Sequence, residues 1–265
     1  MAIVSNGAVA LHYEVGGDVT RPWLVLSGSL GTNLHMWDPQ VAALEKDFRV
    51  LRYDMRGHGR SPVPPGPYTV GEMAVDVIEM MDELDIEQAH FCGLSIGGAI
   101  GQWLAIHHAE RLDRLVLCNT ASKIGTADGW NARIAKVETE GMASISEAVI
   151  GRWFTSQFMR SHETSIIWMR RMLETNNATG YAAACAAVRD MDLREDIRKI
   201  RLPTCVISGD FDLVTPVLDA VSLVSSITWA RLERIQASHI ANIEAPEIFT
   251  ETVLSFLKTG DERDG

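Results

Sequence analysis

Few cysteines occur in this sequence, and none of them is spaced as a metal-binding or redox pair. Cys92, Cys118, Cys185 and Cys205 lie far apart among 265 residues. This spacing excludes a Cys-x-x-Cys site and gives no framework of disulfides. Three of the four fall in strands that we expect to be buried, which is typical of reduced thiols in a cytoplasmic protein.

Long hydrophobic runs and an excess of positive charge are also absent. No apolar run reaches the roughly 18 residues that a membrane-spanning helix needs, and the first residues lack the pattern of a secretion signal. We therefore expect a cytoplasmic protein without a membrane contact. The formal net charge of −11 argues against nucleic acid and anionic membranes as partners.

The sequence does contain a Gly-x-Ser-x-Gly pentapeptide at 93–97, between an apolar run and a helix-forming run. This strand–turn–helix context is typical of a nucleophile elbow, in which a serine sits on a sharp, strained turn. Gly93 and Gly97 have no Cβ, so the turn can close around the serine. We therefore predict Ser95 as the nucleophile, with its hydroxyl at the positive end of the following helix.

Short apolar runs alternate with segments of helical periodicity through most of the chain. This alternation predicts an α/β protein with a mostly parallel, doubly wound sheet. An antiparallel hairpin is expected at residues 3–15, because Asn6-Gly7 is a strong turn signal. Besides the run before Ser95, the predicted strands are 23–26, 48–53, 114–118, 204–208 and 231–235. Besides the helix after Ser95, the predicted core helices are 38–45, 69–84, 217–224 and 246–257.

Residues 123–196 interrupt the alternation with helical segments and no convincing strand. A helical block inserted between two consecutive strands should lie over the carboxyl ends of the strands, where ligands bind in such sheets. We therefore expect a core of residues 1–122 and 197–265 and a cap of residues 123–196. The predicted cap helices are 130–140, 145–158, 163–174 and 181–189.

A serine hydroxyl is a poor nucleophile unless a base accepts its proton. His239 follows the last predicted strand, so it should reach the carboxyl edge of the sheet. A carboxylate must orient this histidine, and the loop after the preceding strand offers Asp210 and Asp212. Asp212 is favoured because the Gly-x-x-Asp spacing places it further into the loop, whereas Asp210 can brace the turn. His58 also invites assignment as a base, but a loop histidine between two glycines is better explained as structural.

A tetrahedral intermediate needs two backbone N–H donors for its oxyanion. In a nucleophile elbow one donor is the residue after the serine, which is Ile96 here. The other should come from the small-residue loop after the first core strand, and we predict the amide of Ser29 for it.

With these residues the sequence resembles the α/β-hydrolase superfamily over nearly its whole length, including the chain order Ser, Asp, His. More closely, it resembles the 3-oxoadipate enol-lactonases of aromatic catabolism. Many relatives carry His-Gly where this chain has Ser27-Gly28. The segments that carry the closer resemblance are Ser-Gly-Ser-Leu-Gly-Thr at 27–32, His-Met-Trp-Asp at 35–38, Cys-Gly-Leu-Ser-Ile-Gly-Gly at 92–98 and Arg-Trp-Phe-Thr at 152–155.

The resemblance implies hydrolysis of a five-membered enol lactone to a keto acid, without a metal or an organic cofactor. The substrate is a small anionic lactone, and its carboxylate needs a partner in an apolar cap. Arg133 is our candidate, because it lies three residues after Trp130 on a predicted cap helix and shares its face. Arg152 and Arg160 are the alternatives.

Other functions are compatible with the same motifs. The chain could be a small-ester carboxylesterase or a C–C bond hydrolase, since these enzymes use the same three residues. A different class is a ligand receptor on this fold with slow turnover, although all three catalytic positions are filled here. The sequence also leaves a homo-oligomer open, because Trp and Met residues of the cap suit an interface as well as a pocket wall.

Overall fold

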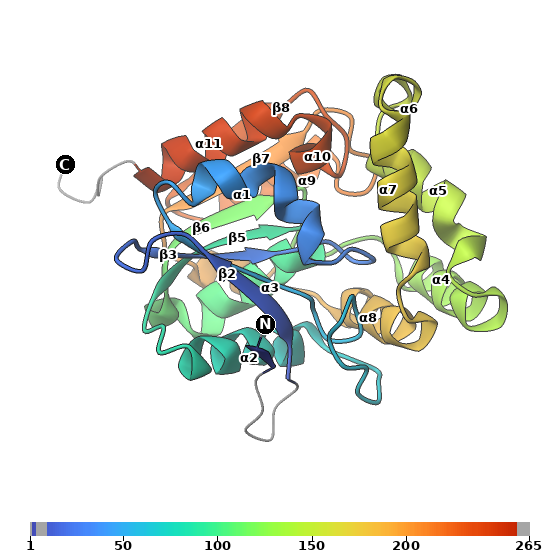
Figure 1. Ribbon diagram of the computed structural model, residues 1–265, viewed down its shortest axis with the longest axis horizontal. Helices are drawn as coiled ribbons and strands as arrows, with labels where there is room; N and C mark the ends of the chain where they lie inside the picture. Colours follow the sequence, from blue (N-terminus) through green and yellow to red (C-terminus); the bar gives the residue numbers. More distant parts are fainter. Residues whose placement is uncertain (1, 4–9, 259–265) are drawn as a thin grey trace.

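The computed structural model describes residues 2–3 and 10–258, which form one twisted sheet flanked by helices (Figure 1). The strand order is β1-β2-β4-β3-β5-β6-β7-β8. From β4 to β8 neighbouring strands are parallel, whereas β2 pairs antiparallel with both β1 and β4. The strands are β1 Ala2–Ile3, β2 His12–Gly16, β3 Trp23–Ser27, β4 Arg49–Tyr53, β5 Ala89–Leu94, β6 Leu112–Cys118, β7 Thr204–Gly209 and β8 Ala230–Ile235.

Helices cover both faces of this sheet, as the alternation in the sequence predicts. Helices α1 and α11 pack together on one face, and α2 packs on α3 over the other face. The core helices are α1 Asp38–Leu44, α2 Val70–Glu83, α3 Ile96–His107, α9 Val217–Ser226, α10 Ala241–Glu244 and α11 Pro246–Lys258. Three short 3₁₀ helices are η1 Leu34–Trp37, η2 Ala109–Arg111 and η3 Asp196–Lys199.

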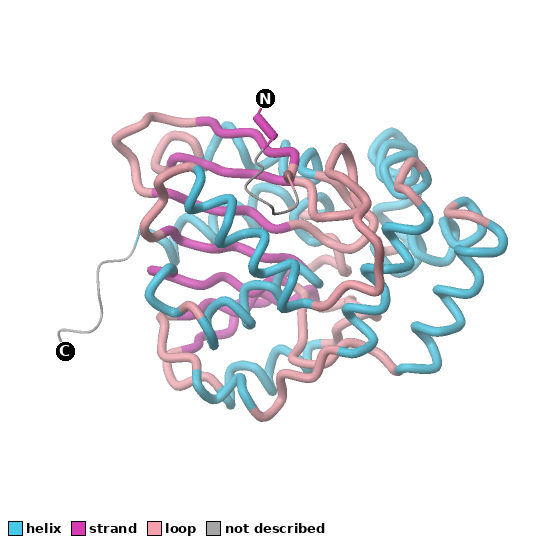
Figure 2. The backbone as a smooth tube through the Cα atoms, turned by 90° about the horizontal axis from the view of Figure 1, so that it is seen from below, coloured by secondary structure: helices cyan, strands magenta, loops and turns pink. Residues whose placement is uncertain are grey.

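Five α-helices and no strand lie between β6 and η3, and they gather at one end of the strands (Figure 2). They are α4 Ala127–Glu140, α5 Ala143–Trp153, α6 Ser156–Ser161, α7 Glu163–Glu174 and α8 Ala178–Asp190. Because β6 and β7 are adjacent and parallel, the chain leaves the sheet for this helical block and returns beside its point of departure.

The single helix predicted at 145–158 is wrong, because the chain breaks there into α5 and α6. Phe154 has extended backbone angles (φ −131°, ψ 151°), and Thr155 then caps α6 by accepting a hydrogen bond from the Phe158 amide at 3.2 Å. The periodicity of apolar residues continues across this break, so no local pattern marks it. The short helix α10 was not predicted either.

The expectations for the first two strands and for the cysteines agree with the structure. The first two strands pair antiparallel, with Ala2 opposite Tyr13, although the Asn6-Gly7 turn lies outside the described residues. All four cysteines are buried and free, three of them in β5, β6 and β7. No helix among the described residues is long and apolar enough to span a membrane.

Candidate active site

Ser95 occupies a strained turn between β5 and α3, with φ 59° and ψ −117°. This positive φ is costly for a residue with a side chain, so its surroundings must enforce it. A Cβ at Gly93 would lie 2.2 Å from the carbonyl oxygen of Gly97. A Cβ at Gly97 would lie 2.2 Å from the carbonyl oxygen of Ser27 in β3. Both glycines are therefore required by contact, as the pentapeptide predicts.

Hydrogen bonds from the neighbouring strand hold the same turn. The Ser95 amide donates to the carbonyl of Cys118 at the end of β6 (2.9 Å), and the Thr120 hydroxyl donates to the Ser95 carbonyl (2.7 Å). These two hydrogen bonds fix the amide and the carbonyl of Ser95. Its side chain reaches the cavity beyond the carboxyl ends of the strands.

Asp212 and His239 meet at the adjoining part of the same edge. Nδ1 of His239 lies 2.9 Å from Oδ2 of Asp212, and the Asn119 amide and Thr215 hydroxyl donate to the same oxygen at 2.9 and 2.7 Å. The amides of Val214 and Thr215 donate to the other oxygen. Burial alone would raise the pKa of Asp212, but the charge of His239 and these side-chain hydrogen bonds outweigh it and hold that pKa far below its usual value.

The competing Asp210 has other partners. Its carboxylate pairs with Arg234 at 2.6 Å and accepts a hydrogen bond from Gln236. Asp210 thus braces the turn after β7, whereas Asp212 contacts the histidine. Of the two aspartates, the structure therefore brings Asp212 to His239 and Asp210 to Arg234.

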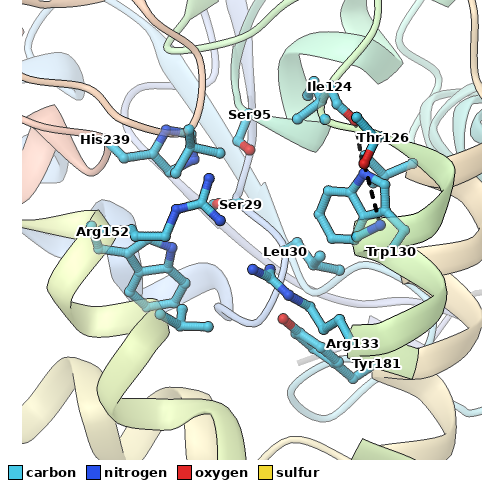
Figure 3. A pocket seen from close by; sticks show the side chains of 16 residues that line it. Ser29, Leu30, Ser95, Ile124, Thr126, Trp130, Arg133, Arg152, Tyr181 and His239 are labelled. Carbon is cyan, nitrogen blue, oxygen red and sulfur yellow. Dashed lines mark hydrogen bonds between the residues drawn. The ribbon is translucent and has the colours of Figure 1, made fainter. Parts of the chain in front are cut away.

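A cavity of about 270 Å³ separates these residues from the helical block (Figure 3). Ser95 and His239 lie at one end of it, although no hydrogen bond joins their side chains among the described residues. Such contacts are often long without a bound ligand. The core contributes Ser29, Leu30, Ser95, Val214 and His239, and the helical block contributes Trp130, Arg133, Val149, Arg152, Trp153, Tyr181 and Val188.

The two amides predicted to bind an oxyanion differ in their present partners. Ile96 is the first residue of α3, so its amide has no acceptor within the helix. The Ser29 amide instead donates to the thioether sulfur of Met36 at 3.2 Å. Sulfur is a weak acceptor, so an oxyanion could replace it.

His58 braces the loop that carries Ser29 and does not line the cavity. Its Nε2 accepts a hydrogen bond from the Gly31 amide at 3.0 Å, and its Nδ1 lies 3.2 Å from the Arg56 carbonyl. Burial lowers the pKa of His58, which favours the neutral ring that these two bonds require. This geometry agrees with the structural interpretation of His58. In the same region the hydroxyl groups of Ser27 and Tyr53 share a 2.7 Å hydrogen bond.

Two arginines reach into the cavity from the helical block. The Arg133 guanidinium lies 4.9 Å from the ring centroid of Trp130, beside Tyr181 (Figure 3). Arg152 donates to the Leu213 carbonyl at 3.2 Å, and partial burial together with the charge of Arg133 lowers its pKa. Neither forms an ion pair with a carboxylate in the described part of the chain. Arg160, the third candidate, does not line the cavity.

Sequence reasoning missed several residues of this site. Asn119 contacts Asp212, and its position directly after β6, with φ 44°, was the available signal. Tyr181 and Trp153 also line the cavity, but their positions depend on how the helices pack, so no local pattern marks them. Within residues 2–3 and 10–258, no group of three or more His, Cys, Asp or Glu side chains is placed to hold a metal ion.

Comparisons with known proteins show what the chain as a whole is similar to. A family model described as alpha/beta hydrolase fold matches residues 22–246. The chain is 42% identical to 3-oxoadipate enol-lactonase 2 of Acinetobacter baylyi, over 94% of both chains. It is 39% identical to 3-oxoadipate enol-lactonase 1 of that organism, over 97% of this chain and 96% of the relative. A crystal structure of the enol-lactonase from Burkholderia xenovorans LB400 superposes with a TM-score of 0.96 and 45% identity, covering 98% of this chain and 100% of that chain.

Proposed function

The chain belongs to the alpha/beta-hydrolase family, and from this premise we propose that it opens 3-oxoadipate enol-lactone to 3-oxoadipate as a serine hydrolase. The enol-lactonases to which it is similar match it over nearly their whole length. The observation that carries the proposal is one cavity that holds Ser95 and His239 together with two arginines, of which Arg152 lies beside His239 and Arg133 lies further away beside Tyr181. Neither arginine pairs with a carboxylate of the described residues.

The first half of the reaction acylates Ser95. Its hydroxyl oxygen attacks the lactone carbonyl while Nε2 of His239 accepts the proton. Asp212 accepts the hydrogen bond from Nδ1–H of His239, which fixes the tautomer and stabilises the imidazolium. Because its pKa is held so low, Asp212 stays ionised while His239 carries the proton.

The oxyanion of the tetrahedral intermediate binds the amides of Ile96 and Ser29. Binding to Ser29 replaces the hydrogen bond to Met36 with a much stronger one to a charged oxygen. Loss of one such donor raises the barrier by about 2.7–4 kcal/mol in comparable enzymes.

Collapse of this intermediate breaks the bond to the ring oxygen, which leaves as an enolate. The enolate takes the proton that His239 removed from Ser95 and becomes the ketone, and His239 is neutral again. The acyl group stays on Ser95 until His239 removes a proton from a water molecule that attacks the ester carbonyl. The second intermediate expels Ser95, which regains its proton from His239. The product is a keto acid with two carboxylates, and no cofactor is consumed.

The free carboxylate of the substrate binds the guanidinium of Arg133, with Trp130 as an apolar wall beside it. An arginine fork suits a planar carboxylate, and its stacking on Trp130 limits the orientations that the fork can adopt. Arg152 lies nearer to Ser95 in Figure 3 and contributes a second positive charge to the cavity. Two cations offset the unfavourable net charge of −11 for an anionic ligand.

We place this reaction in the cytoplasm, because four buried, free cysteines suit a reducing compartment.

The test is consumption of 3-oxoadipate enol-lactone by the wild type and by single variants. Ser95→Ala should lower kcat about 10⁴-fold or more. Arg133→Ala should raise KM roughly ten- to hundredfold, because a charge-assisted hydrogen bond is lost. Arg160→Ala is the matched control and should leave both constants unchanged, since Arg160 lies outside the cavity.

Two outcomes would redirect the proposal. If Arg133→Ala keeps the wild-type KM while Arg152→Ala raises it, the carboxylate binds Arg152. If the wild type ignores the lactone but cleaves neutral activated esters through Ser95, the substrate assignment is wrong and the serine hydrolase assignment stands.

A further inference from the structure

The carboxylate of Glu244, in α10, joins two parts of the molecule that are far apart in the sequence. One oxygen accepts a hydrogen bond from the amide of Ser238 at 2.9 Å, one residue before His239. The other accepts from the hydroxyl of Thr155 and, at 3.2 Å, from the Thr155 amide, where α5 gives way to α6 in the helical block. A single side chain thus holds the histidine loop and the block together.

Backbone contacts continue this connection along the end of α5. The last carbonyl groups of a helix have no partner within the helix. Here the Arg152 carbonyl accepts a hydrogen bond from the Ser238 hydroxyl at 3.2 Å, and the Trp153 carbonyl accepts one from the Ile240 amide at 3.1 Å. The donors lie on either side of His239, and the side chains of Arg152 and Trp153 line the cavity.

The amide, the hydroxyl and the carbonyl of Ser238 all form hydrogen bonds. Its amide contacts Glu244, its hydroxyl contacts Arg152, and its carbonyl accepts from Asn119 at 3.3 Å. Asn119 also contacts Asp212. The backbone before His239 is therefore fixed by the helical block on one side and by the partner of Asp212 on the other.

We propose that Glu244 is a positioning residue that couples the helical block to His239, so that the cavity wall and the general base keep one fixed arrangement. Glu244 touches neither Ser95 nor the cavity and acts through Ser238 and Thr155. The proposal rests on the proposed serine hydrolase mechanism, in which a small displacement of His239 from Ser95 lowers the rate steeply.

The experiment measures kcat and KM for a small neutral activated ester, p-nitrophenyl acetate, alongside the lactone. Glu244→Gln retains the size of the side chain but presents an NH₂ donor to one of two N–H partners, so kcat should fall roughly ten- to hundredfold. KM for the ester should change much less. Thr155→Val, which removes the hydroxyl's share of the connection and leaves that of the amide, should lower kcat roughly three- to tenfold.

Matched variants separate positioning from simple loss of stability. Thr155→Ser keeps the hydroxyl and should keep the wild-type kcat. Thr155→Val removes the hydroxyl's contact with Glu244 and the cap of α6, but keeps the amide's contact with Glu244. The double variant Glu244→Gln/Thr155→Val should be no slower than Glu244→Gln, because both changes break one connection. The NMR resonance of the His239 Nδ1 proton should shift in both single variants and stay in place in Thr155→Ser.

The proposal is overturned if Glu244→Gln keeps a kcat within twofold of the wild type, or if the two substitutions act additively. A normal kcat and an unshifted His239 resonance in Thr155→Val would overturn it as well, even if Glu244→Gln failed to fold. Turnover of the ester without the lactone would contradict only the substrate assignment. The NMR measurement needs no substrate, so it tests the connection even if neither compound reacts.

Discussion

Two aspartates in one loop show how a two-residue difference separates a structural role from a proposed catalytic one. Asp212 receives hydrogen bonds from His239, Asn119 and Thr215, all inside the protein. Asp210 pairs with Arg234 near the surface. The carboxylate that stabilises an imidazolium must be buried and oriented, and only Asp212 meets both conditions.

Asp212→Asn should therefore lower kcat about 10⁴-fold. The asparagine amide either donates to Nδ1 of His239, which then adopts the wrong tautomer, or accepts from Nδ1–H through a neutral oxygen, which stabilises the imidazolium less. Asp210→Asn is the matched control, since it removes only a partly exposed ion pair and should change kcat less than about threefold. Steady-state kinetics on the lactone, or on an activated ester, distinguishes the two. Equal losses in both variants would contradict the assignment of Asp212.

At this scale the sequence was most informative where chemistry demands a fixed spacing. Ser95 is marked by its glycines, and Asp212 and His239 each follow a strand at the same edge of the sheet. Arg152 could be named only as an alternative, because its direction depends on where α5 ends. The contact between Ser29 and Met36 joins residues whose distance no local pattern specifies.

Helix α8 lies so close to the core that neither Gly180 in the helix nor Gly57 in the core has room for a side chain at the contact. A Cβ at Gly180 would lie 2.4 Å from the carbonyl oxygen of Gly57, and a Cβ at Gly57 would lie 2.8 Å from the Cα of Gly180. Tyr181, the next residue, lines the cavity. The distance between this helix and the core therefore sets one wall of the site.

Gly180→Ala should push α8 outward, since backbone atoms of Gly57 cannot yield as a side chain can. We expect a loss of about 1–3 kcal/mol in the free energy of unfolding and a higher KM for the lactone. Thr179→Ala, at an exposed neighbouring position of α8, should stay within about 0.5 kcal/mol of the wild type. Urea denaturation and kinetics provide both measurements, and an unchanged Gly180→Ala would refute the steric argument.

Elements with strong local signals were predicted well, and elements shaped by distant contacts were not. Helix α2 has both its periodic apolar face and a capping box of Thr69 and Glu72. The break between α5 and α6 depends instead on hydrogen bonds to residues 238–244, more than 80 positions away. The sequence alone could not reveal that break, because the partners are not local.

The molecule as a whole should lose stability as the pH falls below neutrality. Burial lowers the pKa of His58 and of His90, so both stay neutral in the folded protein at a pH where the unfolded chain already binds protons. Their contribution to stability is complete above the unfolded pKa of about 6.5 and is lost as the pH falls toward the lower folded values.

Urea denaturation between about pH 8 and pH 5.5 checks this sign. The free energy of unfolding should decrease as the pH decreases, and His58→Gln should make the decrease shallower, because one titrating group has been removed. A free energy of unfolding that rises toward acid pH would show that other titrating groups determine the pH dependence of stability. A slope identical in His58→Gln and the wild type would exclude His58 as a contributor.

The residues of the site are synthesised at different times, because they lie far apart along the chain. The elbow at Ser95 and the loop of Ser29 emerge first, then the helical block, and only afterwards β7 with Asp212 and β8 with the loop of His239. A domain generally folds as a unit, so a single sheet such as this one needs its later strands before it can be completed. The turn of Ser95 itself needs β6 and Thr120, which follow it in the chain. In the proposed mechanism Ser95 therefore has no base until β8 and the loop of His239 have been made.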